Sequence, residues 1–183
     1  MIRTFVALMI PPAWADYLGA ISKELASKTQ RLSWVRAENL HITLRFLGDL
    51  GESGVERVGD AVARAAATVT APRARLGPIG AFPNLARPQV VWVGLDEGEE
   101  AATAVARSVN DALRPSFGPS DKPFRAHLTL ARVREGARGL GALRDAVLPP
   151  PPPAATLDRI CVMKSELHPA GARYTALKEV RLQ

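Results

Sequence analysis

Alternation of apolar and polar positions marks two segments that carry the same motif. Residues 40–47 and 124–133 each contain His-x-Thr-Leu inside an apolar, alternating run. Such alternation is typical of a half-buried strand, in which residues i and i+2 point to the same face. The imidazole and the hydroxyl of each motif therefore share one face of a predicted strand, while the intervening apolar residues point into a core.

The remaining periodicities predict three helices and six further strands. Apolar residues recur at helical spacing over 13–28, 52–69 and 97–114, and we expect Pro115 to end the last helix. We expect Gly48 to break the first histidine strand. The other predicted strands are 2–9, 32–35, 74–82, 88–94, 156–165 and 173–181. The connecting segments are a loop at 116–123, a short helix or loop at 136–148, an extended run at Pro149–Pro153 and a turn at 168–171.

The order of these elements is β-α-β-β-α-β-β-α-β-β-β, which predicts an α+β fold. One histidine strand precedes a helix-strand-strand-helix unit and the other follows it, so that the two histidines lie 86 residues apart. We therefore expect a single bilobal domain over residues 1–183, with two similar lobes related by a pseudo-twofold axis. Each lobe would contribute one histidine strand to a shared cleft.

The composition is that of an ordinary globular chain with an excess of positive charge. Hydrophobic residues make up 47% and charged residues 23%, and the net charge of +6 gives a pI near 10.1. This balance favours a polyanionic partner such as nucleic acid, although many basic proteins bind none. The single cysteine, Cys161, lies in an apolar run, so we expect a buried thiol and a reducing cytoplasmic location. The apolar N-terminal segment is too short to span a bilayer, and we expect a monomer that binds no membrane.

His41 and His127 are the first candidates for catalysis. An imidazole has an ordinary pKa of about 6.5, so one of a pair is neutral while the other is protonated near neutral pH. Such a pair serves as general base and general acid on opposite sides of one phosphorus or carbonyl centre, and the hydroxyls of Thr43 and Thr129 can donate to the non-bridging oxygens. The alternative is two core histidines satisfied by backbone groups. No further ligand flanks either motif at metal-binding spacing, so we expect no metal and no cofactor.

Two arginines are candidates for binding an anionic substrate. Arg45 is in phase with His41 and Thr43, whereas Arg132 is out of phase with His127 and needs a bulge or a strand end to reach the same face. For both arginines the alternative is a surface salt bridge.

Aromatic residues are candidates for a platform on which a base stacks, although core packing is the expectation for most of them. Phe82 is one such candidate, and Tyr174 is a weak candidate from its chemistry alone. The chain has no Walker sequence, no Gly-x-Gly-x-x-Gly and no Gly-x-Ser-x-Gly. This argues against a loop that cradles a nucleoside triphosphate and against the nucleophile elbow of an α/β-hydrolase.

At the two motifs the chain resembles the 2H phosphoesterase superfamily, and within it the RNA 2′,3′-cyclic phosphodiesterase family, also called 2′-5′ RNA ligase. The resemblance covers nearly the whole chain. It is carried by Arg3–Leu8 with Pro11-Pro12, by Trp34-Val35 and Glu38–Leu44 with Phe46-Leu47-Gly48, by Phe82-Pro83, Val91-Trp92 and Gly94-Leu95, by Phe124–Arg132, and by Ser165-Glu166-Leu167, Gly171 and Tyr174. One departure is Ala126, where the family usually has proline before the second histidine.

The resemblance implies a bilobal α+β fold whose antiparallel sheets line a central basic cleft. It implies metal-independent hydrolysis of an RNA 2′,3′-cyclic phosphate to a 2′-phosphomonoester, in which one histidine activates water and the other protonates the leaving 3′ oxygen. Thr43, Thr129 and Arg132 would hold the phosphoryl oxygens, which favours Arg132 over Arg45. The alternatives are a phosphodiesterase for small cyclic nucleotides, the reverse 2′-5′ ligation of RNA ends, and a basic RNA-binding protein without catalysis.

Overall fold

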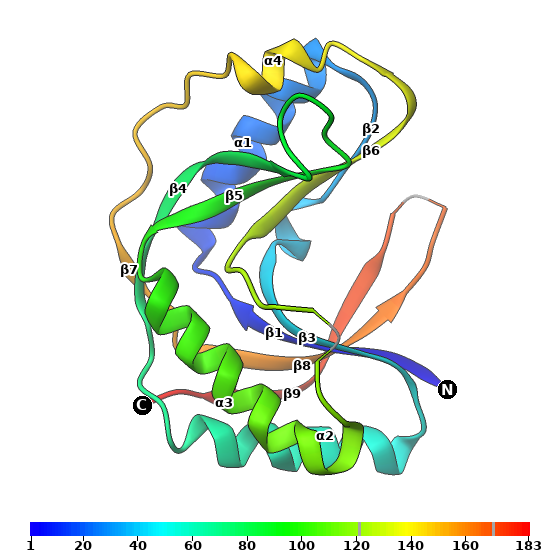
Figure 1. Cartoon of the computed structure of the whole chain (residues 1–183), viewed down its shortest axis with the longest axis vertical. Coiled ribbons are helices and arrows are strands. Elements are labelled where there is room, and N and C mark those ends of the chain that lie inside the picture. Colours follow the sequence, from blue (N-terminus) through cyan, green and yellow to red (C-terminus); the bar gives the residue numbers. More distant parts are fainter. Residues whose placement is uncertain (121, 170) are drawn as a thin grey trace.

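The computed structural model describes residues 1–120, 122–169 and 171–183, and the strands of these residues form one curved antiparallel sheet (Figure 1). The strands are β1 (Ile2–Met9), β2 (Gln30–Trp34), β3 (His41–Leu50), β4 (Arg73–Phe82), β5 (Val90–Glu97), β6 (Leu128–Arg138), β7 (Ala155–Thr156), β8 (Arg159–Glu166) and β9 (Arg173–Arg181). The helices are α1 (Pro12–Lys28), α2 (Glu52–Ala66), α3 (Glu99–Phe117) and α4 (Gly141–Arg144), with a 3-10 turn η1 (Ala37–Asn39). The α+β class is confirmed.

The sheet has two similar halves that meet at the strands with the histidine motifs. The strand order is β7-β4-β5-β6-β3-β1-β8-β9, and β2 pairs with β6 outside this path. β3 and β6 are joined by one pair, Ile42 with Leu128. On each side of this junction, a strand followed by a helix leads to the histidine strand: β1 and α1 precede β3, and β5 and α3 precede β6. This arrangement has the pseudo-twofold relation that the order of elements predicted.

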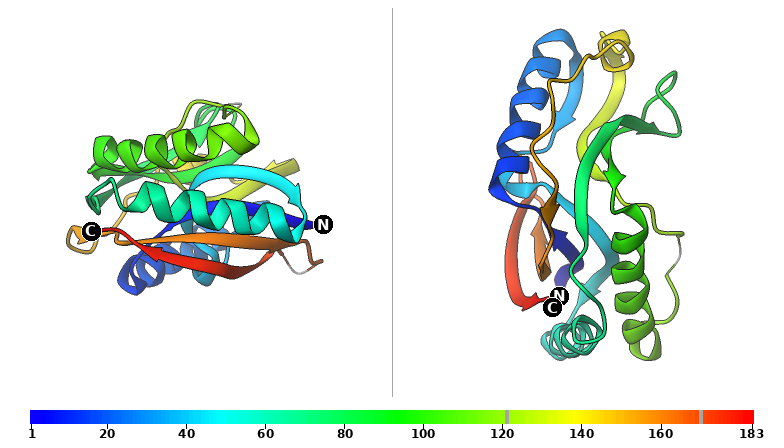
Figure 2. Two further views of the ribbon diagram at one scale, coloured as in Figure 1. Left: turned by 90° about the horizontal axis from the view of Figure 1, so that it is seen from below. Right: turned by 90° about the vertical axis from the view of Figure 1, so that its left-hand side faces the viewer.

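One face of the sheet is apolar and is covered by helices. Ile42 and Leu128 have no exposed surface and belong to a core that contains the apolar stripes of α1, α2 and α3. Figure 2 shows α2 and α3 side by side, and the two helices are in contact. Because side chains alternate along a strand, residues next to Ile42 and Leu128 point to the other face.

A further property of the helices is their length and polarity. Among the described residues, none of them combines the length and the apolar character that crossing a membrane requires.

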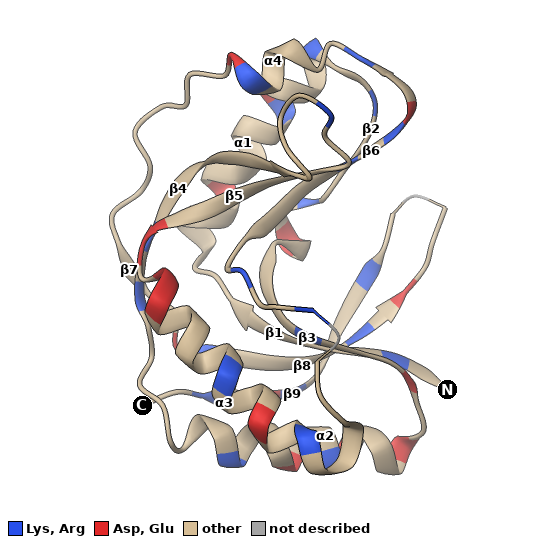
Figure 3. Ribbon diagram, viewed as in Figure 1, with Lys and Arg blue, Asp and Glu red and all other residues tan. Residues whose placement is uncertain are grey.

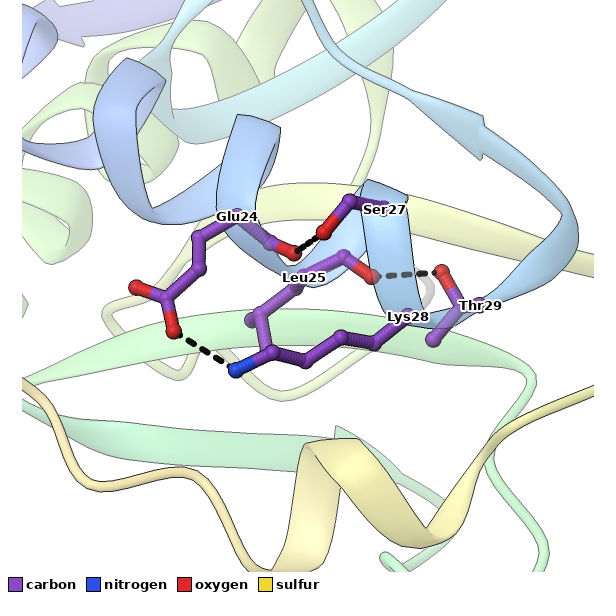
Figure 4. A network of polar contacts seen from close by, with 5 residues as sticks. All are labelled: Glu24, Leu25, Ser27, Lys28 and Thr29. Atoms are coloured by element: carbon purple, nitrogen blue, oxygen red, sulfur yellow. Dashed lines mark hydrogen bonds and ion pairs between the residues drawn. The ribbon is translucent and has the colours of Figure 1, made fainter.

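Side chains of the last turn end α1 without a glycine cap (Figure 4). Thr29 Oγ1 donates to Leu25 O at 2.9 Å, and Ser27 Oγ donates to Glu24 O at 2.6 Å. The bond from Thr29 satisfies one of the last four carbonyl groups, which a helix end leaves unpaired. Lys28 Nζ adds an ion pair with Glu24 Oε1 at 2.7 Å. The chain passes directly from this turn into β2, so the turn fixes where β2 begins.

Several predicted boundaries are wrong. The strand predicted at 156–165 is two strands, β7 and β8, the helix predicted at 52–69 ends at Ala66, and the second histidine strand runs to Arg138 and not to residue 133. β3 continues through Gly48, which adopts a φ of 72° beside a bulge, and ends at Leu50. α3 continues through Pro115 to Phe117, because a proline in the last turn removes only its own N–H donor. The second histidine strand starts at Leu128, later than predicted, because its first ladder pairs form there.

The predicted connections agree with the described residues in part, because α3 runs to Phe117 inside the predicted loop at 116–123 and β6 runs to Arg138 inside the segment at 136–148. The short helix expected within 136–148 is α4, and Pro149–Pro153 lies outside helices and strands. The predicted loop at 116–123 and turn at 168–171 contain Asp121 and Ala170, which lie outside the described residues.

Candidate active site

The two His-x-Thr motifs are neighbours at the centre of the sheet. β3 and β6 run antiparallel and pair at Ile42 and Leu128, the residues between the histidine and the threonine of each motif. In this register His41 and His127 are diagonal neighbours, and such residues lie about 7–8 Å apart on a ladder. Both imidazoles and both hydroxyls point to the face opposite the apolar core. The fold thus brings together the four side chains that periodicity had paired only within each strand.

Each imidazole is held by a backbone carbonyl two residues earlier. Nδ1 of His41 lies 2.7 Å from Asn39 O, and Nδ1 of His127 lies 2.7 Å from Arg125 O. A carbonyl oxygen only accepts, so Nδ1 carries the hydrogen and Nε2 is the basic nitrogen of the neutral ring. Thr43 Oγ1 lies 3.0 Å from Nε2 of His41 and donates to it when the ring is neutral. The backbone therefore satisfies Nδ1 of each ring. Nε2, which in His41 accepts from the Thr43 hydroxyl, is the nitrogen that can exchange a proton.

Both histidines have a lowered pKa. For His41 the main cause is burial, opposed by the hydrogen bond to Asn39 O and reinforced by the charge of His127. For His127 the main cause is again burial, opposed by the hydrogen bond to Arg125 O and reinforced by the charges of Arg125 and Arg132. The neutral ring, which can accept a proton, is therefore favoured at both positions.

A β-bulge in the second motif brings Arg132 to the site. Thr129 pairs with Trp92 of β5, and Arg132 pairs with Val90, so three steps along β6 match two steps along β5. The extra residue lies between Thr129 and Arg132, and Trp92 and Val90 share a face because they are two residues apart. Thr129 and Arg132 therefore share that face as well. The bulge that Arg132 was predicted to need is present.

The first motif contains the same bulge. Thr43 pairs with Ala7 of β1, and Phe46 pairs with Phe5, so three steps along β3 match two steps along β1. Phe46, and not Arg45, is therefore on the face of the histidines. The side chain of Phe46 is 56% exposed. Strict alternation missed this residue, although it stands five positions after its histidine, as Arg132 does.

Arg45 lies on the core face, and the prediction that it is in phase with the motif is wrong. Its side chain is only 6% exposed. Nη1 donates to Asn110 Oδ1 at 3.1 Å, and Nη2 donates to Gly118 O at 2.8 Å and to Phe117 O and Pro119 O at 3.2 Å. These acceptors lie in α3 and just beyond its end, where carbonyl groups lack helical partners and a positive charge is favourable. Arg45 thus holds α3 against β3.

Aromatic side chains surround His41. The ring of Phe5 lies 4.9 Å from the imidazole, and the ring of Tyr174 lies 5.4 Å away with an interplanar angle of 82°. Phe46 continues this cluster, with its ring 5.4 Å from that of Phe5. The structure therefore places the weak candidate Tyr174 beside the first histidine.

A second aromatic cluster supports His127. The ring of Phe82 lies 5.1 Å from the imidazole at an angle of 88°, and Trp92 lies 6.2 Å away. The guanidinium of Arg125 stacks on Trp92 at 4.6 Å. The Trp92 ring packs directly against the backbone of Gly80, where a Cβ atom would come within 2.2 Å of the ring. Phe82 is thus brought to the site as a neighbour of the second histidine.

The arrangement suits acid–base chemistry at an anionic centre. Two Nε2 atoms, two hydroxyls and the Arg132 guanidinium share one face of the sheet. When one imidazole is protonated and the other is neutral, a reacting group there meets an acid, a base and donors for developing negative charge. Among residues 1–120, 122–169 and 171–183, no group of three or more His, Cys, Asp or Glu side chains is placed to hold a metal ion.

Sequence comparison links this site to a known family. The family model described as the 2′-5′ RNA ligase superfamily matches residues 10–169. The RNA 2′,3′-cyclic phosphodiesterase of Archaeoglobus fulgidus is 38% identical over 132 residues, which cover 72% of this chain and 73% of that protein. The protein of the same name from Methanothermobacter thermautotrophicus is 29% identical over 189 residues, and the match covers 99% of each chain.

Solved structures share the fold. The crystal structure of TT0787 of Thermus thermophilus has a TM-score of 0.75 and 26% sequence identity, covering 99% of this chain and 98% of that one. The crystal structure of E. coli LigT complexed with 3′-AMP also has a TM-score of 0.75, with 24% identity and the same coverage. Together with the match of the family model to most of the chain, these likenesses show that the protein belongs to the 2′-5′ RNA ligase superfamily.

Proposed function

We propose that the chain is a metal-independent RNA 2′,3′-cyclic phosphodiesterase that uses His41 and His127 as an acid–base pair. The observation that carries this proposal is the pairing of the two motifs across Ile42 and Leu128, which sets two imidazoles diagonally on one face with Nδ1 fixed and Nε2 available. The names of the relatives supply the substrate class.

The proposed reaction is an in-line displacement at phosphorus. One histidine takes a proton from water as the water oxygen attacks the phosphorus atom of the cyclic phosphate. The bond from phosphorus to O3′ breaks, and the other histidine donates its proton to O3′. The bond to O2′ stays intact, so the product is a 2′-phosphomonoester with a free 3′ hydroxyl.

The remaining residues of the site hold the substrate in this proposal. Thr129 and Arg132 donate to the non-bridging oxygens, on which negative charge develops, and the Thr43 hydroxyl turns from Nε2 of His41 to donate there as well. Phe46 offers an exposed ring on which the terminal base stacks, and Tyr174 and Phe82 support the two imidazoles. We propose a monomeric enzyme of the reducing cytoplasm, in keeping with the single, buried Cys161.

The test is incubation with an RNA that ends in a 2′,3′-cyclic phosphate. We expect a product that keeps the phosphate on O2′, full activity in excess EDTA, and a loss of about 10²–10⁴ in rate for His41→Ala and for His127→Ala. His168→Ala is the matched control, because this exposed histidine lies in neither motif. Salt-dependent RNA binding with no product would favour the RNA-binding alternative, and EDTA inhibition reversed by a divalent metal would overturn the metal-free mechanism.

A further inference from the structure

A row of arginines leaves the active site along the β2–β6 pair. Arg132 and Arg134 are two residues apart on β6, and Arg31 lies on β2. In the same two strands, Leu32 pairs with Val133 and both side chains pack against the core. Because residues alternate between faces, Arg132 and Arg134, on either side of Val133, point away from the core, to the side on which the bulge places Arg132 with Thr129. Arg31, next to Leu32, is exposed. Figure 3 shows Lys and Arg positions recurring along β2 and β6.

The backbone of Arg31 is unusual for this residue type. Its φ is 61°, and Arg31 is the one non-glycine residue of the described chain with a positive φ. It lies where the register of β2 and β6 shifts, and its guanidinium crosses to Gly136 of β6, with Nη1 3.4 Å from where a Cβ atom of that glycine would be. Glycine would adopt this φ without strain. An arginine held there indicates that the side chain itself has a role.

The charges of these arginines are not neutralised by neighbouring carboxylates. Arg134 Nε donates to Ser33 Oγ at 2.7 Å, which fixes the guanidinium and leaves its two terminal nitrogens for another acceptor. No ion pair joins Arg31, Arg132 or Arg134 to an Asp or Glu among the described residues, although Glu135 lies next to Arg134 in the chain. Like charges gathered on adjacent strands repel one another, and an anionic partner relieves that repulsion.

We propose that this arginine track binds the RNA chain upstream of the cyclic phosphate, with Arg132 at the reacting phosphate and Arg134 and Arg31 at the phosphates that precede it. Residues two apart on a strand are separated by about 6.8 Å, close to the distance between successive phosphates of an extended RNA strand. The inference rests on the proposed function and deepens it, because it makes the end of an RNA chain, and not a mononucleotide, the preferred substrate.

The experiment compares an oligonucleotide with a mononucleotide, each ending in a 2′,3′-cyclic phosphate. We expect the double variant Arg31→Gly/Arg134→Ala to lower kcat/KM for the oligonucleotide about tenfold and to change it less than twofold for the mononucleotide. Binding of an oligonucleotide that ends in a 2′-phosphate should lose about 0.7 from the slope of log K against log salt for each lost contact. Arg64→Ala/Arg107→Ala is the matched control. These arginines are exposed on α2 and α3, so replacing them removes the same amount of charge at positions away from the track.

The outcomes separate a binding role from a structural one. Arg31→Gly relieves backbone strain, so the variant should be at least as stable as the wild type while it binds RNA less well. Equal losses with both substrates, an unchanged oligonucleotide kcat/KM, or the same loss in the control variant would overturn the arginine track. If the wild type hydrolyses neither substrate, the proposed function fails, and the salt slope of oligonucleotide binding still decides whether the track exists.

Discussion

Replacing Arg45 distinguishes a structural arginine from a phosphate-binding one. The variant Arg45→Ala removes a guanidinium that is 6% exposed and that donates to one side-chain oxygen and three backbone carbonyls. A hydrogen bond from a charged donor contributes about 1.5–3 kcal/mol net. The three carbonyls share one terminal nitrogen, which has only two hydrogens, and the chain beyond α3 is partly open to water that can replace the lost donor. We therefore expect the free energy of unfolding to fall by about 3 kcal/mol.

The assay is urea unfolding together with steady-state kinetics of the folded protein. A domain with about 5–15 kcal/mol of stability stays folded after such a loss, so kcat/KM can be measured for the same variant. We expect the urea midpoint to fall with an unchanged m value, and kcat/KM for a cyclic phosphate to stay within about threefold of the wild type. Arg45→Lys should recover part of the stability, because an ammonium keeps the charge at the helix end without the planar fork. A loss of about 100-fold in kcat/KM at an unchanged urea midpoint would refute the structural role.

Two further predictions concern the histidines and Phe46. Burial lowers the pKa of His41 and of His127 below 6.5, so the unfolded chain binds more protons than the folded one between the lowered values and 6.5. The urea midpoint should therefore be constant above pH 7 and fall as the pH drops below 6.5. His41→Ala should flatten this dependence. A midpoint that rises on acidification would contradict the assignment. Phe46→Ala should raise KM about 5- to 100-fold with little change in kcat or in unfolding free energy, since base stacking is worth about 1–3 kcal/mol and the ring is 56% exposed. Phe46→Tyr should retain the wild-type KM. An unchanged KM in Phe46→Ala would exclude stacking on this ring.

Much of the fold could be predicted from periodicity because most of its elements are long and regular. The three long helices have clear apolar stripes, and strands such as β1 and β8 contain continuous apolar runs. Two of the errors lie where a local rule treats a single residue as a stop signal. Gly48 and Pro115 are ordinary breakers, yet β3 gains ladder pairs beyond Gly48 and α3 gains a further cap beyond Pro115. Those contacts belong to the assembled molecule, so a local rule could not include them.

The sequence predicts correctly which face of the sheet each side chain points to, up to the third residue after each histidine. Alternation placed His41 with Thr43 and His127 with Thr129, and the register at Ile42 and Leu128 agrees with it. Beyond the threonines the strict alternation failed at both motifs. A bulge is set by how a strand pairs with its neighbour, and the neighbours β1 and β5 are distant in sequence. The sequence alone therefore favoured Arg45 by phase, and Arg132 only through the family resemblance.

The two bulges explain how one duplicated motif presents two different side chains. In both motifs the bulge moves the fifth residue after the histidine onto the site face, and that residue is Phe46 in one half and Arg132 in the other. The residue before it faces the core, where Arg45 binds the end of α3 in one half and Ala131 is fully buried in the other. The pseudo-twofold axis therefore repeats the imidazoles and the hydroxyls, but sets an apolar ring opposite a guanidinium. In the proposed reaction this asymmetry orients the substrate, because the base can stack only on the side of Phe46 while the phosphate oxygens are drawn to Arg132.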